Sequence, residues 1–309
     1  MINIIGGAGF LGTQLAKALD LHDLRFRIFD KALSGDEFCD VSDLSSMDSL
    51  PSADTVVNLA AEHRDNVQPR SLYNDVNVVG AQNVCDYCRR CGIKKIVFTS
   101  SVAVYGFAPE GTDESGALNP FNDYGRTKMK AEAIYREWLA EDPQQRTLVI
   151  VRPTVIFGEN NRGNVYNLFR QIATRRFIML GAGTNRKSMA YVKNAAEFLA
   201  FSLHFGPGEH LYNYVDKPDI DMNTLVSRCR SALFRKKNVG LRLPGWLAYL
   251  VGYGADAVAA ITGKRLPVSA IRVKKFMSTT AFNSNVSATG FVPPFTLEEG
   301  IDRTLKHEF

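Results

Sequence analysis

Tyr124 and Lys128 lie four residues apart in a segment whose apolar residues Ala131, Ile134 and Trp138 continue at helical spacing. Side chains four residues apart share one face of a helix, so the phenol and the ammonium group can converge on one point. An ammonium group beside a phenol stabilises the phenolate and lowers its pKa, which a general base at neutral pH requires. The pair predicts proton transfer at a hydroxyl group, although the same spacing also occurs in purely structural helices.

Ser101 directly follows the apolar run Lys95–Ser100, which is predicted to be a buried strand. Open parallel sheets bind ligands at the carboxyl ends of their strands, so the Ser101 hydroxyl is well placed to hold the same substrate oxygen. Ser101, Tyr124 and Lys128 are therefore the predicted catalytic residues.

A glycine-rich turn follows the first apolar run, Ile2–Ile5, and opens a predicted helix. Glycines 6, 9 and 12 allow a tight turn, a close approach of backbone N–H groups to a pyrophosphate, and packing of the helix on the strand. This strand–turn–helix context predicts a dinucleotide site that includes Phe10 and Leu11.

An acidic residue, Asp30, ends the second predicted strand, 18 residues after Gly12. A carboxylate there accepts hydrogen bonds from a ribose 2′-hydroxyl and repels a 2′-phosphate, which favours NAD over NADP. The alternative is a solvated turn residue. Asp40 and Val41, which follow a short predicted third strand, are expected to cap the adenine.

Strand and helix patterns alternate through the first half of the chain, which predicts an α/β fold with a doubly wound parallel sheet. We expect a Rossmann-type domain over residues 1–153, rejoined by residues 187–215, and a smaller α/β substrate-binding lobe over residues 154–309. The predicted strands are Ile2–Ile5, Arg25–Phe29, Thr55–Ala60, Lys95–Ser100 and Leu148–Val151, and the predicted helices are Phe10–Leu19, Ser71–Cys91 and Asp123–Glu141.

The composition is that of a globular protein, with 45% hydrophobic and 22% charged residues in 309. A net charge of +5 is too small to predict a nucleic-acid partner. The amino terminus has no signal-peptide pattern, so we expect a cytoplasmic protein. Cys85, Cys88 and Cys91 have helical spacing and predict a buried helix stripe, and no metal site is predicted.

The segment Leu243–Ile261 is nearly uncharged and has two interpretations. It is either a buried or half-buried helix of the second lobe, or an element that contacts a membrane surface or a lipid. Basic residues at Lys236–Lys237, Lys264–Arg265 and in the run 272–275 are able to meet anionic headgroups. Peripheral association with the inner face of the cytoplasmic membrane is the corresponding expectation.

Taken together, these motifs resemble the extended short-chain dehydrogenase/reductase superfamily, the NAD-dependent nucleotide-sugar epimerases and dehydratases. The resemblance implies that Tyr124 is the base, that Lys128 holds the nicotinamide ribose, and that Ser101 is their hydrogen-bonding partner. It also implies further NAD contacts, at Leu59, Ala60, Ala61, Asn77 and Pro153.

Two positions discriminate among the reactions of this superfamily. Val102–Ala103 replaces the Asp–Glu pair of the sugar 4,6-dehydratases, so dehydration is disfavoured while epimerisation and keto reduction remain. Val155 replaces an asparagine of many hexose epimerases. Donor-rich loops imply a diphosphate-linked sugar, and the expected substrate contacts are Glu62, His63, Ser101, Asn164, Arg186 and Ser188.

Longer runs are similar to a narrower group, the bacterial 4-epimerases of N-acetylglucosamine linked by diphosphate to undecaprenol, which serve O-antigen and lipopolysaccharide synthesis. These runs include AAEHRDNV (60–67), RPTVIFGENNRGNVYNLF (152–169), KSMAYV (187–192) and IDRTLKHEF (301–309). The resemblance implies inversion at C4 through a transient 4-keto sugar, on a lipid carrier or on UDP.

Several alternatives stay open at this point. A 4-keto-sugar reductase shares the same catalytic residues, a 3β-hydroxysteroid-type dehydrogenase shares the scaffold, and a dinucleotide-sensing protein needs no catalysis. By analogy with the superfamily, the helices Ser71–Cys91 and Asp123–Glu141 are expected to form a homodimer interface.

Overall fold

Six strands form a sheet in the order β2-β1-β3-β4-β5-β9, with every neighbouring pair parallel. The four inner strands are rich in valine and isoleucine, whereas the edge strand β9 has neither residue and was not predicted. Buried parallel strands favour such β-branched residues because both faces are covered. This arrangement confirms the predicted doubly wound α/β fold. The strands are β1 (Ile2–Ile5), β2 (Phe26–Phe29), β3 (Thr55–Asn58), β4 (Lys95–Thr99), β5 (Thr147–Pro153) and β9 (Gly208–Tyr214).

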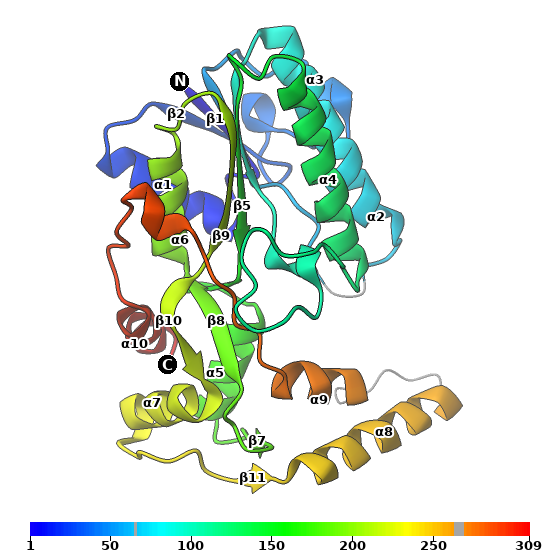
Figure 1. Cartoon of the computed structure of the whole chain (residues 1–309), viewed down its shortest axis with the longest axis vertical. Coiled ribbons are helices and arrows are strands. Elements are labelled where there is room, and N and C mark those ends of the chain that lie inside the picture. The colour runs from blue at the N-terminus through cyan, green and yellow to red at the C-terminus, as the bar shows by residue number, and fades with distance from the viewer. Residues whose placement is uncertain (65–66, 263–268) are drawn as a thin grey trace. The chain divides into compact units, whose positions relative to one another are not determined.

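Helices cover both faces of this sheet in the computed structural model (Figure 1). On one face, α1 (Phe10–Leu21) packs beside α6 (Val192–Ser202). On the other, α3 (Gly80–Cys91) packs beside α4 (Asp123–Ala140). The predicted helix over 71–91 forms as α2 (Ser71–Asn74), a π-helical turn (Asp75–Val79) and α3 in direct succession.

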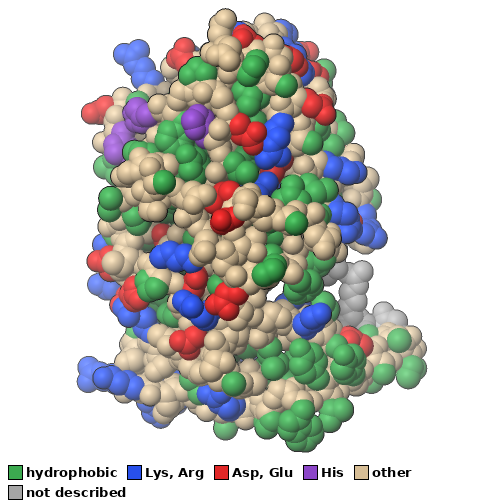
Figure 2. All heavy atoms as spheres, in the orientation of Figure 1, with side chains coloured by type: hydrophobic (Ala, Val, Ile, Leu, Met, Phe, Trp, Pro, Cys, Tyr) green, Lys and Arg blue, Asp and Glu red, His purple; other side chains and the backbone are tan. Residues whose placement is uncertain are grey.

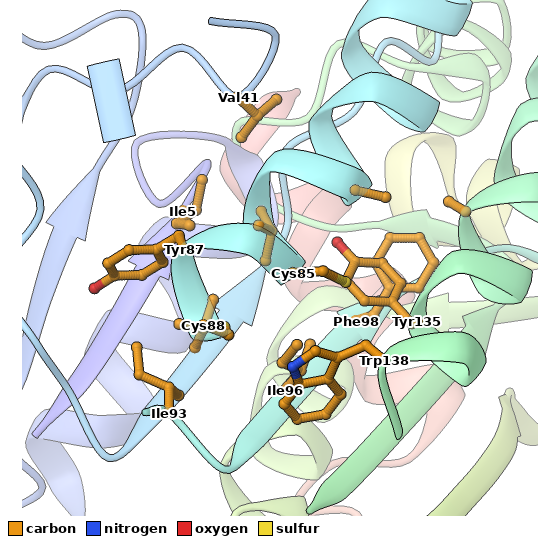
Figure 3. Packing of buried hydrophobic residues seen from close by; sticks show 14 of the residues in the cluster. Ile5, Val41, Cys85, Tyr87, Cys88, Ile93, Ile96, Phe98, Tyr135 and Trp138 are labelled. Atoms are coloured by element: carbon orange, nitrogen blue, oxygen red, sulfur yellow. The ribbon is translucent and has the colours of Figure 1, made fainter. Parts of the chain in front are cut away.

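Successive strand residues point to opposite faces, so each strand contributes to two core layers. Val56 and Ile96 pack beneath α3 and α4, whereas Val57 and Val97 pack beneath α1 and α6. Figure 3 shows the first layer, where Tyr135 and Trp138 of α4 lie near strand residues. Cys85 and Cys88 are fully buried in this layer, which confirms the predicted helix stripe at these two positions, whereas Cys91 is half-buried at its edge. Their neighbours in the layer include Cys39, Val84, Tyr87 and Phe98.

The structure describes residues 1–64, 67–262 and 269–309, and these residues form two compact units. The predicted headgroup-binding pair Lys264–Arg265 lies outside this description. The first unit holds Met1–Ile156, Ala190–Asp216 and Phe282–Phe295, and the second holds Phe157–Met189, Lys217–Ala281 and Thr296–Phe309. Hydrogen bonds hold both ends of the segment Phe282–Phe295 in the first unit: Asn283 N donates to Thr112 O (2.9 Å) and Phe295 N to Asn194 Oδ1 (3.1 Å).

The later part of the chain forms shorter sheets and several helices. A three-stranded sheet has the order β10-β8-β6, and β11 pairs in parallel with β7. The elements are β6 (Val155–Phe157), α5 (Asn164–Ala173), β7 (Met179–Leu180), β8 (Arg186–Tyr191), β10 (Asp216–Asp221), α7 (Met222–Phe234), β11 (Arg242–Leu243), α8 (Gly245–Thr262), α9 (Ala270–Met277) and α10 (Leu297–Glu308).

Two predictions about local structure are wrong. The short strand expected before Asp40 is a 3-10 turn (Gly35–Glu37) and a single bridge between Asp30 and Phe38. Gly35 has a left-handed φ of 62°, which interrupts an extended strand.

The segment at Leu243–Ile261 is helical only from Gly245, after Pro244, and only Ala248 and Gly252 of α8 are buried. A fully buried helix is therefore wrong. A helix packed along one side fits, because Gly245, Leu247, Tyr249, Ala255 and Ala259 are half-buried. Among residues 1–64, 67–262 and 269–309, no helix has both the length and the apolar character needed to cross a membrane.

Candidate active site

The glycine turn between β1 and α1 packs directly against the segment that follows β3. Gly6 has a φ of 78°, and a Cβ atom there would lie 2.5 Å from Ala60 N. A Cβ atom on Gly12 would lie 2.4 Å from the carbonyl oxygen of Gly7. Only glycine fits these two positions, so the sequence requirement for a tight turn and close helix packing is met locally.

The amino terminus of α1 faces this turn without a capping side chain. Gly9 is the N-cap residue, and no side chain among the described residues caps the helix there. The first backbone N–H groups of a helix lack intrahelical partners and carry partial positive charge. Phe10 and Leu11 therefore present N–H groups suited to a pyrophosphate, and the residues present fit a dinucleotide.

Asp30 lies beside the glycine turn, immediately after β2. Its carboxylate accepts hydrogen bonds from Ala8 N (3.1 Å) and from Ala32 N (3.0 Å). The half-buried side chain is thus fixed at the carboxyl end of the strand, where a ribose hydroxyl group would be read.

The predicted adenine-capping residues differ in exposure. Asp40 is half-buried, and its Oδ1 accepts hydrogen bonds from both the backbone and the hydroxyl of Ser42. Val41 is buried in the core and its carbonyl accepts a hydrogen bond from Asn83 Nδ2 (2.8 Å). Because the Val41 side chain is buried, Val41 would contact an adenine base through its backbone atoms.

Asn77, in the π-helical turn, ties three segments together. Its Oδ1 accepts from Glu62 N (2.9 Å), and its Nδ2 donates to Glu62 O (3.0 Å) and to Thr127 Oγ1 (2.9 Å). These bonds fix the loop after β3, which contains Leu59, Ala60 and Ala61, relative to α4. Asn77 therefore positions the walls of the site through its neighbours.

The start of α4 places Tyr124 next to Ser101. Asn122 caps the helix by accepting a hydrogen bond from Gly125 N (2.9 Å). A Cβ atom on Gly125 would lie 2.4 Å from Ala103 O, so glycine lets this first turn approach the 3-10 turn Val102–Tyr105. The Ser101 hydroxyl lies near enough to the Tyr124 phenol to lower its pKa.

The pKa of Tyr124 is raised by burial and lowered by the Ser101 hydroxyl, with a net rise. The sequence predicted the opposite direction, from an adjacent ammonium group. The reason is the position of Lys128, whose Nζ donates to Thr99 O (2.8 Å) and lies 4.6 Å from the centroid of the Phe98 ring. Desolvation of the half-buried phenol raises its pKa more than the Ser101 hydroxyl lowers it.

Lys128 is almost completely buried, with 2% of its surface exposed. Burial lowers the pKa of its amine to about 7, and the Glu132 carboxylate opposes this shift. An amine with this pKa changes its charge near neutrality, which is unusual for lysine and typical of functional sites.

Glu132 and Arg152 form a fully buried ion pair that the sequence predictions missed. Arg152 Nε and Nη2 donate to the two carboxylate oxygens of Glu132 at 2.8 and 2.6 Å, and Ser100 Oγ donates to the same carboxylate at 2.6 Å. Arg152 Nη1 donates to Tyr105 Oη (2.6 Å), which donates to Asn213 Oδ1 (2.8 Å). Glu132 could have been found from the sequence, because residues 124, 128 and 132 are each four apart and therefore share one face of a helix.

The remaining predicted contacts are divided between the two units. In the first unit, buried Glu62 pairs with Arg64, whose hydrogen bonds lower the pKa of the Glu62 carboxyl group, and His63 is exposed. Pro153 is buried at the end of β5.

In the second unit, the predicted substrate residues occupy three different settings. Asn164 is exposed at the first position of α5, and Arg186 is exposed at the start of β8. Ser188 is buried, and its hydroxyl donates to Asp219.

Comparison with known proteins gives a consistent result. The NAD dependent epimerase/dehydratase family matches residues 2–214. The chain is 49% identical to N-acetyl-alpha-D-glucosaminyl-diphospho-ditrans,octacis-undecaprenol 4-epimerase of Escherichia coli O157:H7, over 99% of this chain and 94% of that protein. It is 27% identical to UDP-glucose 4-epimerase of Vibrio cholerae, over 98% and 94% of the two chains.

Solved structures share the fold. UDP-glucose 4-epimerase of Thermus thermophilus in complex with NAD has a TM-score of 0.74 at 19% identity, covering 99% of this chain and 98% of that one. The family description also confirms NAD as the predicted cofactor. By the span of the family match and the identity to the E. coli protein, this chain belongs to the NAD dependent epimerase/dehydratase family.

Proposed function

We propose that this protein is a 4-epimerase that interconverts N-acetylglucosamine and N-acetylgalactosamine on a diphosphate carrier, with undecaprenyl diphosphate as the preferred carrier. The observation that carries this proposal is the 49% identity to the E. coli O157:H7 enzyme across 99% of the chain. The placement of Ser101 near Tyr124, with buried Lys128 one helical turn further along α4, supports it at the level of chemistry. The product would serve the synthesis of O-antigen and lipopolysaccharide.

The catalytic residues handle one proton at the sugar O4. Tyr124 takes that proton as C4 becomes a ketone and returns it when the ketone is reduced from the other face. Ser101, whose hydroxyl lowers the pKa of Tyr124, holds the same sugar oxygen. NAD, when bound, accepts the C4 hydride and gives it back, and its positive ring favours the phenolate of Tyr124.

We assign Lys128 the role of positioning the cofactor ribose. Its amine is held by the Thr99 carbonyl at the carboxyl end of β4, directly before the strand leads into Ser101. The glycine turn and the uncapped start of α1 would hold the pyrophosphate, and Asp30 the adenosine ribose.

The carrier is decided by one paired incubation. Purified protein is given N-acetylglucosamine linked to undecaprenyl diphosphate in detergent, and separately UDP-N-acetylglucosamine, and the galacto epimer is quantified after acid release of the sugar. We expect at least about tenfold higher kcat/KM for the lipid-linked substrate, equivalent to about 1.4 kcal/mol. Equal or higher kcat/KM for the UDP sugar would assign the nucleotide carrier instead.

A nucleotide-linked substrate is the second candidate, and the Vibrio cholerae UDP-glucose 4-epimerase, 27% identical over almost the whole chain, favours it. A 4-keto-sugar reductase is separated from both epimerases by stoichiometry. An epimerase regenerates its cofactor in each turnover, so supplied NADH should not be consumed in proportion to product. Consumption of one NADH per product molecule would assign the reductase.

We further propose that the protein works as a homodimer at the inner face of the cytoplasmic membrane. A carrier lipid confines its diphosphate to the bilayer surface, so an enzyme that acts on this diphosphate must work at that surface. The helices α3 and α4 are the proposed dimer interface, by analogy with the superfamily. Light scattering coupled to size-exclusion chromatography measures the mass, and a mass of one chain would exclude the dimer.

A further inference from the structure

Helix α8 of the second unit exposes an apolar face that globular packing does not explain. It spans 18 residues, and its described side chains include one charged group, Asp256. Six large apolar residues have 49–85% of their surface exposed: Trp246, Leu250, Val251, Tyr253, Val258 and Ile261. Figure 2 shows hydrophobic side chains gathered over this helix, at the lower right of the view.

The face turned away from the protein is the apolar one. Ala248 and Gly252, four residues apart, are the buried positions of α8. Trp246, Leu250 and Tyr253 are spaced four and three residues apart and lie roughly on the opposite side of the helix. An ordinary surface helix carries charged and polar residues there, so α8 has the pattern of an element with an apolar environment on that side.

The exposure does not come from a detached helix, because α8 is fixed to α9. A Cβ atom on Gly252 would lie 2.9 Å from Ala270 Cα, so glycine permits close contact between the two helices. The Asp256 carboxylate accepts a hydrogen bond from Ala270 N (3.0 Å), at the first turn of α9. The one charge of α8 is therefore used within the helix pair, which we call the α8–α9 hairpin.

The second helix of the hairpin adds positive charge. Helix α9 contains Arg272, Lys274 and Lys275, which are exposed, and no acidic residue. An apolar face beside a group of basic side chains matches the surface of an anionic bilayer, where acyl chains lie beneath negative headgroups. Trp246 and Tyr253 are residue types enriched at that boundary.

We propose that the α8–α9 hairpin docks on the surface of an anionic phospholipid bilayer, with α8 lying in the interface. This inference rests on the proposed function only for its biological purpose, which is to bring the catalytic residues to a lipid-linked diphosphate. A second copy of the chain is the other possible cover for an apolar face. The charge disfavours it, since two hairpins brought together would place three basic residues of each copy near those of the other.

The experiment uses the full chain and vesicles of phosphatidylethanolamine with or without phosphatidylglycerol. Binding is measured by co-sedimentation, and insertion by the emission of Trp246. The other tryptophan, Trp138, is fully buried and gives a constant background. We expect binding to the phosphatidylglycerol vesicles, a blue shift of the emission, and weakening by salt, because exposed charges are screened.

The test variant combines Leu250→Asp with Ile261→Asp, which places charge in the apolar face without touching the core. The matched control combines Leu21→Asp with Val292→Asp, two exposed apolar residues of the first unit with 78% and 80% exposure. We expect the test variant to bind vesicles at least about tenfold more weakly, and the control to bind like the wild type.

Three outcomes would overturn the proposal: no vesicle binding by the wild type, equal binding by both variants, or a hairpin variant that loses only self-association. Epimerase activity on UDP-N-acetylglucosamine and on the detergent-dispersed lipid substrate is measured in parallel. An active protein that ignores vesicles refutes the docking surface alone, and a vesicle-binding protein without activity refutes the proposed function alone.

Discussion

Replacing Glu132 by glutamine should destabilise this protein far more than the loss of an ordinary ion pair. Glu132 and Arg152 are 0% and 2% exposed, and their two hydrogen bonds measure 2.8 and 2.6 Å. Glu132→Gln removes the carboxylate charge and leaves a guanidinium ion buried beside a neutral amide. Breaking one side of a buried pair costs about 3–5 kcal/mol, because the remaining charge has neither water nor a counter-ion.

That loss is large compared with the total stability of ~5–15 kcal/mol expected for a folded protein. For a chain of this size it corresponds to a fall in Tm of roughly 5–15 °C. The control is Glu209→Gln, which removes an exposed partner of Arg136 at 2.8 Å, in a pair whose side chains are 33% and 35% exposed. This substitution leaves in place the second contact of Arg136, which is to Glu132 at 3.3 Å. Solvent screens the Arg136–Glu209 pair, so its loss should cost about 0–1 kcal/mol.

Differential scanning calorimetry of both variants at neutral pH gives the comparison directly. A double variant, Glu132→Gln with Arg152→Gln, should lose less stability than the sum of the two single variants, because removing both charges leaves neither one unpaired. Equal Tm values for Glu132→Gln and Glu209→Gln would refute the assignment of Glu132 as a buried, energetically coupled carboxylate.

Three further predictions concern the catalytic and cofactor residues. Tyr124→Phe should lower the C4 inversion rate by roughly 10²–10⁴-fold while cofactor binding, measured by calorimetric titration, is retained; full activity would remove Tyr124 from the proton pathway. Gly6→Ala should abolish NAD binding, because the φ of 78° and the 2.5 Å approach to Ala60 N leave no room for a Cβ atom. The control Gly35→Ala, at a φ of 62° with no atom within 4 Å of the added Cβ atom, should bind NAD normally. Equal NAD affinities of the two variants would show that the Gly6 turn tolerates a side chain. Burial lowers the pKa of Lys128 from 10.5 to about 7. The buried amine therefore lowers the free energy of unfolding by its full amount below pH 7, and this loss disappears as the pH rises toward 10.5. The free energy of unfolding of the wild type should therefore gain a contribution of roughly a few kcal/mol from Lys128 between pH 7 and pH 10, and Lys128→Met should lack this contribution. Urea denaturation at the two pH values measures it, and the same pH dependence in the wild type and the variant would contradict the prediction.

The fold could be predicted from sequence because its signals are local and repeated. Strands β1, β3, β4 and β5 are short Val/Ile-rich runs, and the helices between them have their own periodicity. The edge strand β9, with the sequence GEHLYNY, contains neither residue type and was missed. The Gly6–Gly12 turn is equally readable, since its glycines serve a backbone geometry that is fixed within a few residues.

Features that depend on distant partners could not be read in the same way. The Glu132–Arg152 pair joins α4 to β5, and the chain through Tyr105 to Asn213 spans 108 residues of sequence. The pKa of Tyr124 was predicted in the wrong direction because the position of the Lys128 amine depends on the Thr99 carbonyl. A spacing of four residues places two side chains on one face but does not decide which partner each one takes.

Helix α8 shows a third kind of difficulty. An uncharged run of this length reads as core in a globular protein, and hydropathy alone does not distinguish a buried helix from an exposed apolar one. The distinction came from the two small residues, Ala248 and Gly252, which are the only buried positions among the described residues of α8.

The order in which the two units share the polypeptide has a consequence for biosynthesis. The backbone passes from one unit to the other after residues 156, 189, 216, 281 and 295. The large sheet lacks its edge strand β9 until residue 214 has been made, and the segment held by Asn283 and Phe295 follows later still. The first unit therefore cannot be completed during synthesis until both longer segments of the second unit, residues 157–189 and 217–281, have also been made.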